Sequence, residues 1–439
     1  MAQCSTQNNA LVASLLNSLS GIMNSAAFVA AHRVSPGDFT RKRKLSAPTV
    51  MGFLMQLVGG QALQESLDGF FMALVGQAHV MRHVTKSAFG QARKKLRATA
   101  FSALNREWVQ GWLEGVGAES WCGLRVLAAD GCCLRLPARA ENCVRFGPGP
   151  QEDGSVPMAR CVGLYAVAAR QFLEMVVGRY DQGERGLLLQ ALGVIKPGDV
   201  LVLDRGYPAR WLFAVLHARG VNYCVRIEGC GWTAVQALVR SRDSESVVSL
   251  KLTGKDRQHW ADHGQPGAAP SAVKVRLVKV MLPNGKLQIM ATSLMDTRAY
   301  PAAAFGDLYR KRWCIEEAYK LIKQRQHLEG FSGELPDAIE QEIQAKILVH
   351  NITLALCHSA GQQLGEDKLG QWQVNRAYAL KQVGAIIINS VKGKWRAVKQ
   401  GIRALADVLA KTLEQVRPNR SFPRNHAIGG AHLPRRAYR

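Results

Sequence analysis

Acidic residues are scarce in this chain of 439 residues. It has 33 Asp and Glu against 57 Lys and Arg, so its formal net charge at pH 7 is +24 and its sequence pI is near 9.9. A charge balance this basic, spread along the whole chain, favours a polyanionic partner. DNA is the first candidate, and an anionic membrane surface is the competing one.

Long hydrophobic runs are missing as well. No stretch contains the 18 or more consecutive apolar residues that a membrane-spanning helix requires. The N-terminal segment ALVASLLNSLSGIMNSAAFVAA is apolar, but Asn and Ser interrupt it and no basic region precedes it. Because a signal peptide needs that basic region, we expect ordinary helices here and no membrane partner.

Closely spaced cysteine pairs are also missing. The ten cysteines include the adjacent Cys132 and Cys133 and otherwise lie scattered, without a C-x2-C pair. This spacing predicts neither a disulfide framework nor a zinc site. Cys161 and Cys224 lie within apolar runs, where a free thiol behaves as a small hydrophobic side chain. The pattern is typical of the reducing cytoplasm, and with a DNA partner it predicts association with the nucleoid.

Two acids stand at the ends of short apolar runs. In GLRVLAADGCCLRLP the run Leu124–Ala129 leads to Asp130, and in GDVLVLDRGYP the run Val200–Leu203 leads to Asp204. Short apolar runs bounded by Gly and Pro predict core strands. An acid where such a strand leaves the sheet is costly to desolvate unless it is paired or binds a cation. Taken alone, Asp130 is more often a turn residue, and Asp204 is evenly balanced between a turn residue and a metal ligand.

A third acid lies on a helix with a narrow polar stripe. The segment LYRKRWCIEEAYKLIK predicts a helix near residue 310, in which a rotation of about 100° per residue puts four polar side chains within an arc of about 60°. These are Tyr309, Arg312, Glu316 and Lys323. One carboxylate beside two cations and a phenol suits a divalent metal next to a phosphate backbone. Taken alone, Glu316 has the simpler interpretation of an exposed helix acid paired with Arg312 four residues earlier.

The spacing Y-x2-R-x3-E-x6-K of this stripe resembles the Tyr-Arg-Glu-Lys motif of bacterial DDE transposases of the IS-four family. The resemblance covers most of the chain, from the basic helical N-terminus through the segments DGCCLRLP, VLVLDRGY and KQRQHLEGF. It implies an α/β (α+β) fold with an RNase H-like catalytic core. It also implies an enzyme that cleaves DNA at the ends of an insertion sequence and joins those ends to target DNA, in cut-and-paste transposition.

Residue roles follow from the resemblance. The three acids would form the catalytic triad and bind two Mg²⁺ ions, for which Mn²⁺ can substitute: Asp130, Asp204 and Glu316. Hard oxygen ligands suit these ions, and two of them about 4 Å apart stabilise both the attacking and the leaving oxygen of a phosphoryl displacement. The other three motif residues would hold DNA phosphates: Tyr309, Arg312 and Lys323. Further DNA contacts are expected from Arg205, Arg93 and Lys94.

The chain divides by pattern into five regions. Residues 1–118 read as helical throughout and carry basic clusters at Arg41–Lys44 and Arg93–Arg97. Such helices in a protein that acts on DNA predict a helix-turn-helix-like domain for the element ends, and a helical bundle with solvated basic faces is the simpler alternative. The expected domains are 1–118 for binding DNA ends, 119–225 with 298–330 for the catalytic core, 226–297 for a β-rich insertion, 331–416 for a helical C-terminal region and 417–439 for a basic, disordered tail.

The expected insertion contains SVVSLKL, SAVKVRLVKVML and KLQIMATSL, which alternate apolar and polar residues as half-exposed antiparallel strands do. The sequence PNGK at 283–286 predicts a hairpin turn. We expect a basic face of the insertion to contact DNA, formed by Lys274, Arg276 and Lys279. The resembled family places an aromatic side chain of this insertion against a flipped base. The candidates by location are Trp232 and Trp260, although either is more often a core residue.

Two other functions are compatible with the sequence. A nuclease or resolvase on the same fold would cleave DNA without strand transfer. A non-catalytic DNA-binding protein derived from a transposase, such as a domesticated element, would have no need to keep all three acids. We expect an active transposase that works as a homodimer on double-stranded DNA, with the terminal repeats of its element and the target as substrates.

Overall fold

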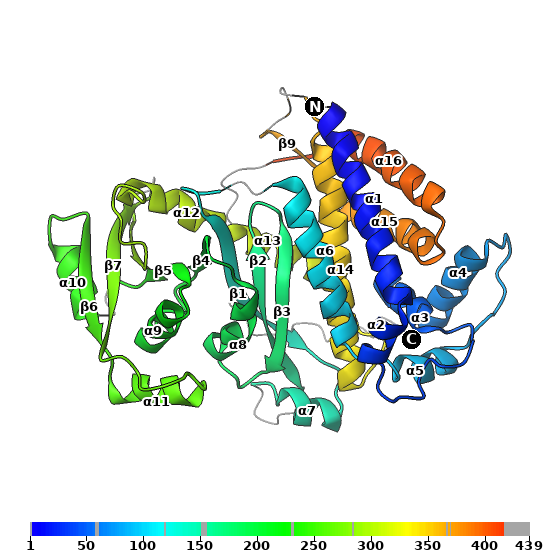
Figure 1. The fold of residues 1–439 in the computed structure, drawn as a ribbon, viewed down its shortest axis with the longest axis horizontal. Helices are drawn as coiled ribbons and strands as arrows, with labels where there is room; N and C mark the ends of the chain where they lie inside the picture. The colour runs from blue at the N-terminus through cyan, green and yellow to red at the C-terminus, as the bar shows by residue number, and fades with distance from the viewer. Residues whose placement is uncertain are drawn as a thin grey trace. The chain divides into compact units, whose positions relative to one another are not determined.

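The computed structural model describes residues 2–57, 61–117, 120–150, 156–229, 232–282, 285–365, 368 and 370–416. The predicted basic tail, 417–439, lies outside the described residues. The chain forms two compact units, each built from separated segments, whose elements are labelled in Figure 1. We call them the sheet unit (Ala118–Cys133 and Arg160–Ala318) and the helical unit (Met1–Gly117, Leu134–Ala159 and Tyr319–Arg439).

An eight-stranded sheet forms the sheet unit's centre, with the strand order β3-β2-β1-β4-β5-β8-β7-β6. Strand β1 runs parallel to β4 and β4 runs parallel to β5, whereas β8 joins β5 in the antiparallel direction. The strands from β3 to β5 form the predicted RNase H-like core. The bounds are β1 (Arg125–Arg135), β2 (Met158–Ala166), β3 (Gln171–Arg179), β4 (Asp199–Leu203), β5 (Asn222–Ile227), β6 (Glu245–Lys251), β7 (Ala272–Met281) and β8 (Leu287–Thr292).

The central strand β4 is completely buried. Every residue of β4, which reads DVLVL, is buried, as expected for a parallel strand covered on both faces. The helices that follow these strands are α8 (Glu184–Ala191), α9 (Arg210–Ala218), α10 (Thr233–Arg240), α11 (Gly254–Asp262), α12 (Phe305–Lys311) and α13 (Trp313–Arg325), with short 3-10 turns η1 (Leu192–Val194) and η2 (Ala302–Ala304).

The first predicted strand is confirmed and is longer than expected. The apolar run Leu124–Ala129 leads to Asp130 within strand β1, which runs unbroken from Arg125 to Arg135. A small residue after the acid therefore continues the strand rather than ending it.

The predicted insertion does not form a separate sheet. Its strands β7 and β8 pair in antiparallel register as predicted, and residues 283–284 of the predicted turn lie outside the described residues. Strand β8 also pairs with β5 and so extends the core sheet. The expected basic face is wrong in part, because Arg276 is fully buried and donates to the backbone oxygens of Leu294 and Tyr300. Lys279, an odd number of residues away, lies on the opposite face of β7 and donates to the Ser241 oxygen.

The two insertion tryptophans differ in exposure. Trp260 is 5% exposed and its indole nitrogen donates to the Gly267 oxygen, which makes it a core residue. Trp232 is half-buried at the start of α10, with the Arg210 guanidinium 5.6 Å from its ring centre. Of the two candidates for contact with a flipped base, only Trp232 has ring surface to offer.

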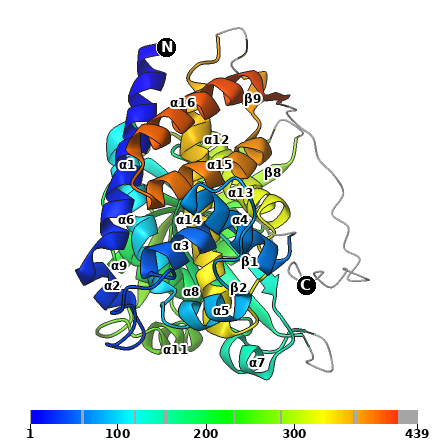
Figure 2. The same cartoon turned by 90° about the vertical axis from the view of Figure 1, so that its right-hand side faces the viewer.

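The helical unit is organised around one long, almost completely buried helix, α14. Helices α1, α3, α6, α15 and α16 pack along it (Figure 2). The bounds are α1 (Ala2–Asn24), α2 (Ala26–His32), α3 (Ala47–Gln56), α4 (Leu63–Val75), α5 (Lys86–Arg93), α6 (Thr99–Val116), α7 (Ala140–Phe146), α14 (Pro336–Gly361), α15 (Arg376–Val391) and α16 (Trp395–Lys411), with a small ribbon of β9 (Trp372–Val374) and β10 (Leu413–Gln415).

The packing of the helical unit differs from the predicted division of the chain. Helix α1 approaches α6 closely because Gly111 and Gly115 leave room for Leu15 and Leu11. The Ser20 hydroxyl in α1 donates to a backbone oxygen of α15. The helices before residue 117 are confirmed, but they share one core with the C-terminal helices instead of forming a core of their own.

Within the described residues, no single helix has the length and the apolar composition of a membrane span. The consecutive pair Thr6–Asn24 and Ala26–His32 meets these two criteria only when taken together across a bend of 68°. Among the cysteines that the structure describes, no disulfide is formed.

Candidate active site

Parallel pairing of β1 with β4 brings the first two acids together. The register runs from Arg125 opposite Asp199 to Ala128 opposite Val202. Continued by two residues, it places Asp130 beside Asp204, one residue past the end of β4. Because neighbouring strands lie about 4.8 Å apart, two carboxylates at this position share one small space.

A backbone amide fixes one oxygen of each of these carboxylates. The Gly131 amide donates to Asp130 Oδ1 at 2.9 Å, and the Gly206 amide donates to Asp204 Oδ1 at 2.8 Å. Both side chains are half-buried. The backbone amide just after each acid thus orients one oxygen of the carboxylate, and the other oxygen can face a different ligand.

The third acid reaches the same place through an arginine. Helices α12 and α13 meet at Arg312, whose backbone is helical, so the predicted single helix is only slightly broken. The Arg312 guanidinium donates to Asp130 Oδ2 at 3.3 Å and to Glu316 Oε1 at 2.6 Å. Its side chain is 6% exposed. The expected pairing of Glu316 with Arg312 is present, but it is buried rather than on the surface.

Opposing interactions set the pKa of Asp130. The pKa of Asp130 is raised to about 6, chiefly because burial penalises its charged form, and the carboxylates of Asp204 and Glu316 raise it further. The Arg312 guanidinium and the Gly131 amide act in the opposite direction. A second positive charge among these acids would therefore stabilise them.

The remaining motif residues lie nearby along the chain. Tyr309 is buried, its ring centre is 5.7 Å from the Arg312 guanidinium, and burial raises its pKa against the opposing effect of Arg312 and Arg226. Lys323 follows Glu316 by about two turns of α13 and is half-buried. Contact of these side chains with DNA phosphates stays a prediction.

The structure places the other expected DNA contacts in contrasting surroundings. Arg205 is exposed and forms only a surface ion pair with Glu228, at 3.4 Å. Lys94 is exposed at the end of α5. Both side chains are accessible to a phosphate backbone.

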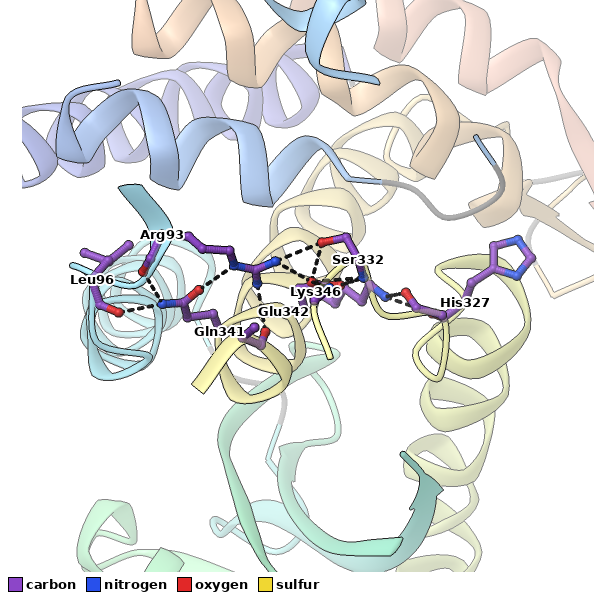
Figure 3. A network of polar contacts seen from close by, with 10 residues as sticks. Arg93, Leu96, His327, Ser332, Gln341, Glu342 and Lys346 are labelled. Atoms are coloured by element: carbon purple, nitrogen blue, oxygen red, sulfur yellow. Dashed lines mark hydrogen bonds and ion pairs between the residues drawn. The ribbon is translucent and has the colours of Figure 1, made fainter. Parts of the chain in front are cut away.

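Arg93 is the exception, and its expected contact with DNA needs correction. It is 5% exposed, and its guanidinium donates to Gln341, Ser332, Glu342 and the Ala338 oxygen at 2.9–3.1 Å (Figure 3). All of its nitrogens are engaged inside the helical unit. The basic cluster in the sequence did not distinguish this arginine from its exposed neighbours, because its partners lie about 250 positions further along the chain.

Three residues near the acids escaped the sequence reasoning. Glu184, at the start of α8, lies against Gly131 so closely that a Cβ atom there would be 2.3 Å from the carboxyl carbon. Tyr207 is fully buried in the loop after Asp204, and Arg185 donates to three backbone oxygens of that loop. The DRGYP segment hinted at Tyr207, but nothing in the sequence distinguished Glu184.

The donor set fits a hard divalent cation in its chemistry. Carboxylate oxygens are the ligands that Mg²⁺ and Mn²⁺ prefer. In the part of the chain that the structure describes, however, no three His, Cys, Asp or Glu side chains stand ready to hold a metal ion. The Arg312 guanidinium bonds both Asp130 and Glu316 instead.

The chain is similar to known proteins over most of its length. The family model described as Transposase DDE domain matches residues 122–352, more than half of the chain. The Escherichia coli (strain K12) transposase InsG of insertion sequence element IS4 is 25% identical over 351 residues, which cover 78% of this chain and 76% of that protein. The transposase InsZ of the same strain is 24% identical over 186 residues, 42% of this chain and 61% of that protein.

Among solved structures, a piggyBac transposase synaptic complex with hairpin DNA aligns over 96% of this chain and 86% of its own, with a TM-score of 0.44 and 9% identity, too distant a likeness to add weight. The family match includes all three acids, Asp130, Asp204 and Glu316. The chain therefore belongs to the DDE transposases, in the family of insertion sequence element IS4.

Proposed function

We propose that this DNA transposase moves its element by cut-and-paste transposition, with Asp130, Asp204 and Glu316 as the catalytic triad. The observation that carries the proposal is the convergence of these acids from β1, the end of β4 and α13, where each of the other two raises the pKa of Asp130. A fold has no structural need for three neighbouring acids beside two central strands of a sheet. Such a cluster is a cost to stability unless a cation occupies it.

The bound ions would be two Mg²⁺, which supply stabilisation of the attacking and leaving oxygens of the phosphoryl group. Asp130 and Asp204 would hold their ligand oxygens towards the ions, because a backbone amide already fixes the other oxygen of each carboxylate. Water would first attack the strand at the element's end. The freed 3′-OH would then attack target DNA, so that one bond breaks for each that forms.

Arg312 would change partners during this cycle. In the structure its guanidinium pairs with Asp130 and Glu316. Cations on those carboxylates would repel the guanidinium and remove its bonds, and a DNA phosphate would then be its best remaining ligand, bound through two parallel hydrogen bonds. Tyr309, which stacks against it, and Lys323 would complete the phosphate contacts.

Recognition of the element ends would come from the helical unit. A hollow of about 750 Å³ is lined on one side by Arg41, Arg43 and Lys44 and on the other by α5, whose N-terminus is capped by Thr85. An exposed helix beside a basic loop is suited to binding in a major groove. The ends would be held in pairs by a homodimer, and the summed positive charge would make binding strongly dependent on salt, by about −0.9 in log K per log unit of salt for each phosphate neutralised.

The test is a cleavage and strand-transfer assay on DNA that carries the ends flanking the protein's own gene, with Mg²⁺. Asp204→Asn should bind these ends and yield neither cleaved nor joined product. Asp243→Asn is a matched control, because it removes one exposed carboxylate of the same sheet unit. Cleavage by Asp204→Asn would refute the triad, cleavage without joining by the unmodified protein would indicate a nuclease, and end binding without cleavage would indicate a non-catalytic binding protein.

A further inference from the structure

A fourth carboxylate lies beside the triad, on an element that the family motif does not include. Glu184 is the first residue of α8, and its carboxyl group rests on Gly131, the residue after Asp130. A Cβ atom at position 131 would be 2.3–2.6 Å from all three atoms of that group. The glycine is therefore required for Glu184 to approach the strand that carries the first catalytic acid.

A buried hydroxyl lies among the same acids. Tyr207 has no exposed surface, and its hydroxyl makes no hydrogen bond of normal length and angle with any residue that the structure describes. Burial raises the pKa of Tyr207 well above its ordinary value, and the carboxylates of Glu184, Asp130 and Asp204 raise it further, in that order. The hydroxyl is thus within electrostatic reach of three carboxylates and has a proton that it can donate to one of them.

Two cations of the described residues act on Glu184. The Arg160 guanidinium is 4.0 Å from Glu184 Oε1, at the limit of an ion pair. Arg185, the next residue, attracts the Glu184 and Asp204 carboxylates, while its hydrogen bonds go to the backbone oxygens of Gly206, Tyr207 and Pro208 at 2.8–3.2 Å. The first two residues of α8 therefore contact both catalytic strands: Glu184 reaches the β1 side, and Arg185 holds the loop after Asp204.

We propose that Glu184 and Tyr207 are positioning residues of the metal site, with Glu184 as a fourth acid whose charge and hydrogen bonding hold the cations between Asp130 and Asp204. This inference rests on the proposed function of the triad. The hydrogen bond of the Tyr207 hydroxyl to Glu184 falls outside normal geometry, which is costly for a buried hydroxyl and points to a ligand whose binding improves it. When cations draw the carboxylates inward, Tyr207 donates to Glu184 and fixes its orientation, as outer residues do for metal ligands.

Binding of Mn²⁺ to the full-length, metal-free protein tests this proposal without the need for activity. Titration calorimetry would compare the unmodified protein with Glu184→Gln, Tyr207→Phe, Asp204→Asn and the control Asp243→Asn. We expect Mn²⁺ affinity to fall about 10- to 100-fold in Glu184→Gln and Tyr207→Phe, as is typical for residues that support metal ligands. It should fall furthest in Asp204→Asn and stay unchanged in Asp243→Asn.

Thermal unfolding separates positioning from a structural role. Tyr207→Phe keeps the packed ring and removes only the hydroxyl, so Tm without metal should be unchanged or higher. A lower Tm together with normal Mn²⁺ affinity would overturn the proposal for Tyr207. Normal Mn²⁺ affinity in Glu184→Gln, with Asp204→Asn impaired, would overturn it for Glu184 and leave the triad intact. If Asp204→Asn also bound Mn²⁺ normally, the proposed function itself would fail.

A suppressor pair tests the contact on which the inference depends. Gly131→Ala should lower Tm, because its new methyl group would collide with the Glu184 carboxylate. Glu184→Ala removes that carboxylate, so the double variant should recover to the Tm of Glu184→Ala alone. A loss of Tm in Gly131→Ala that persists unchanged in the double variant would overturn the placement of Glu184.

Discussion

Two buried arginines, one in each unit, differ in how completely their guanidinium groups are hydrogen-bonded. The side chains of Arg93 in the helical unit and Arg312 in the sheet unit are each 6% exposed, and each forms an ion pair with a buried or half-buried acid. Arg93 donates through all three of its nitrogens, and its partner Glu342 also accepts from the Ser332 amide at 2.9 Å. Burial of Arg93 costs side-chain entropy and hydration, and a complete set of hydrogen bonds offsets that cost.

Arg312 lacks that completeness. Its Nε atom is buried and has no hydrogen bond within the described chain, and it faces two acids that retain 18% and 17% exposure. The Arg93 cluster has a complete set of hydrogen bonds, whereas the Arg312 cluster has not, and we expect the second to exchange one cation for another at smaller cost. From this difference in hydrogen bonding we predict a structural role for Arg93 and a functional role for Arg312.

The largest expected effect is on activity alone. Asp204→Ala should reduce end cleavage by about a thousandfold or more, because metal ions supply several kcal/mol of transition-state stabilisation. Its Tm and its affinity for element ends should stay close to those of the unmodified protein, as circular dichroism and gel shift would show. A matching loss of Tm would mean that Asp204 belongs to the structural class, with Arg93.

The next effect is on stability. Arg93→Ala should lower the free energy of unfolding by about 3–5 kcal/mol, because it leaves the Glu342 charge buried without its partner. Urea unfolding provides the measurement, with Arg145→Ala as the control, since Arg145 pairs with Glu340 on the surface. Replacing Arg93 and Glu342 together should recover part of the loss. A loss for Arg93→Ala no greater than that of the control would remove the contrast between the two clusters.

A smaller effect is expected when the poised arginine is removed. Arg312→Ala should cost about 1 kcal/mol in the metal-free protein, because water can solvate the half-exposed acids it leaves. It should also tighten Mn²⁺ binding by about tenfold, or 1.4 kcal/mol, since a competing cation is gone. End cleavage should still fall, more than duplex affinity does, because the phosphate contact is lost.

Arg310→Ala is the matched control for Arg312→Ala, since Arg310 is exposed and pairs with Asp307 three residues earlier. Calorimetry and urea unfolding would be run on both variants. Weaker Mn²⁺ binding in Arg312→Ala than in Arg310→Ala would mean that the guanidinium helps to hold the metal site together and does not compete with the metal.

The contrast also marks what the sequence could and could not predict. Local patterns or one helix turn are enough to predict strand β4, the β7–β8 pair, the helices before residue 117 and the pairing of Arg312 with Glu316. The approach of Asp130 to Arg312 was expected only from the family resemblance. The burial of Arg93 and Arg276 does not, because it depends on partners elsewhere in the chain.

The placement of Glu184 on Gly131 likewise depends on how α8 returns to the sheet, which no local pattern records. The division of the structure into two compact units differs from the expected domains for the same reason. Each helix of the N-terminal region has a recognisable apolar stripe, but the stripe does not identify the helix against which it packs. In the structure, α1 and α6 pack against α14.

The smallest expected effect is a pH dependence confined to the helical unit's cluster. Lys346 is fully buried near Glu342 and donates to the His327 and Gly330 oxygens (Figure 3). Burial lowers its pKa to about 8, against the attraction of Glu342. The unfolded chain keeps the ordinary pKa near 10.5 and so binds more protons between these values. The free energy of unfolding should therefore gain a contribution that rises with pH from about 8 to 10.5.

Lys346→Met removes the titrating group and keeps the side-chain volume. As pH rises from 7.5 to 10, the free energy of unfolding of the unmodified protein should therefore increase relative to that of Lys346→Met. Urea unfolding at the two pH values measures this shift, with the exposed Lys320→Met as control. Parallel pH profiles for the unmodified protein and Lys346→Met would show that Lys346 stays charged in the fold. The Arg93 cluster would then hold one more charge than its bonds satisfy, and it would resemble the Arg312 site more closely than its hydrogen bonds suggest.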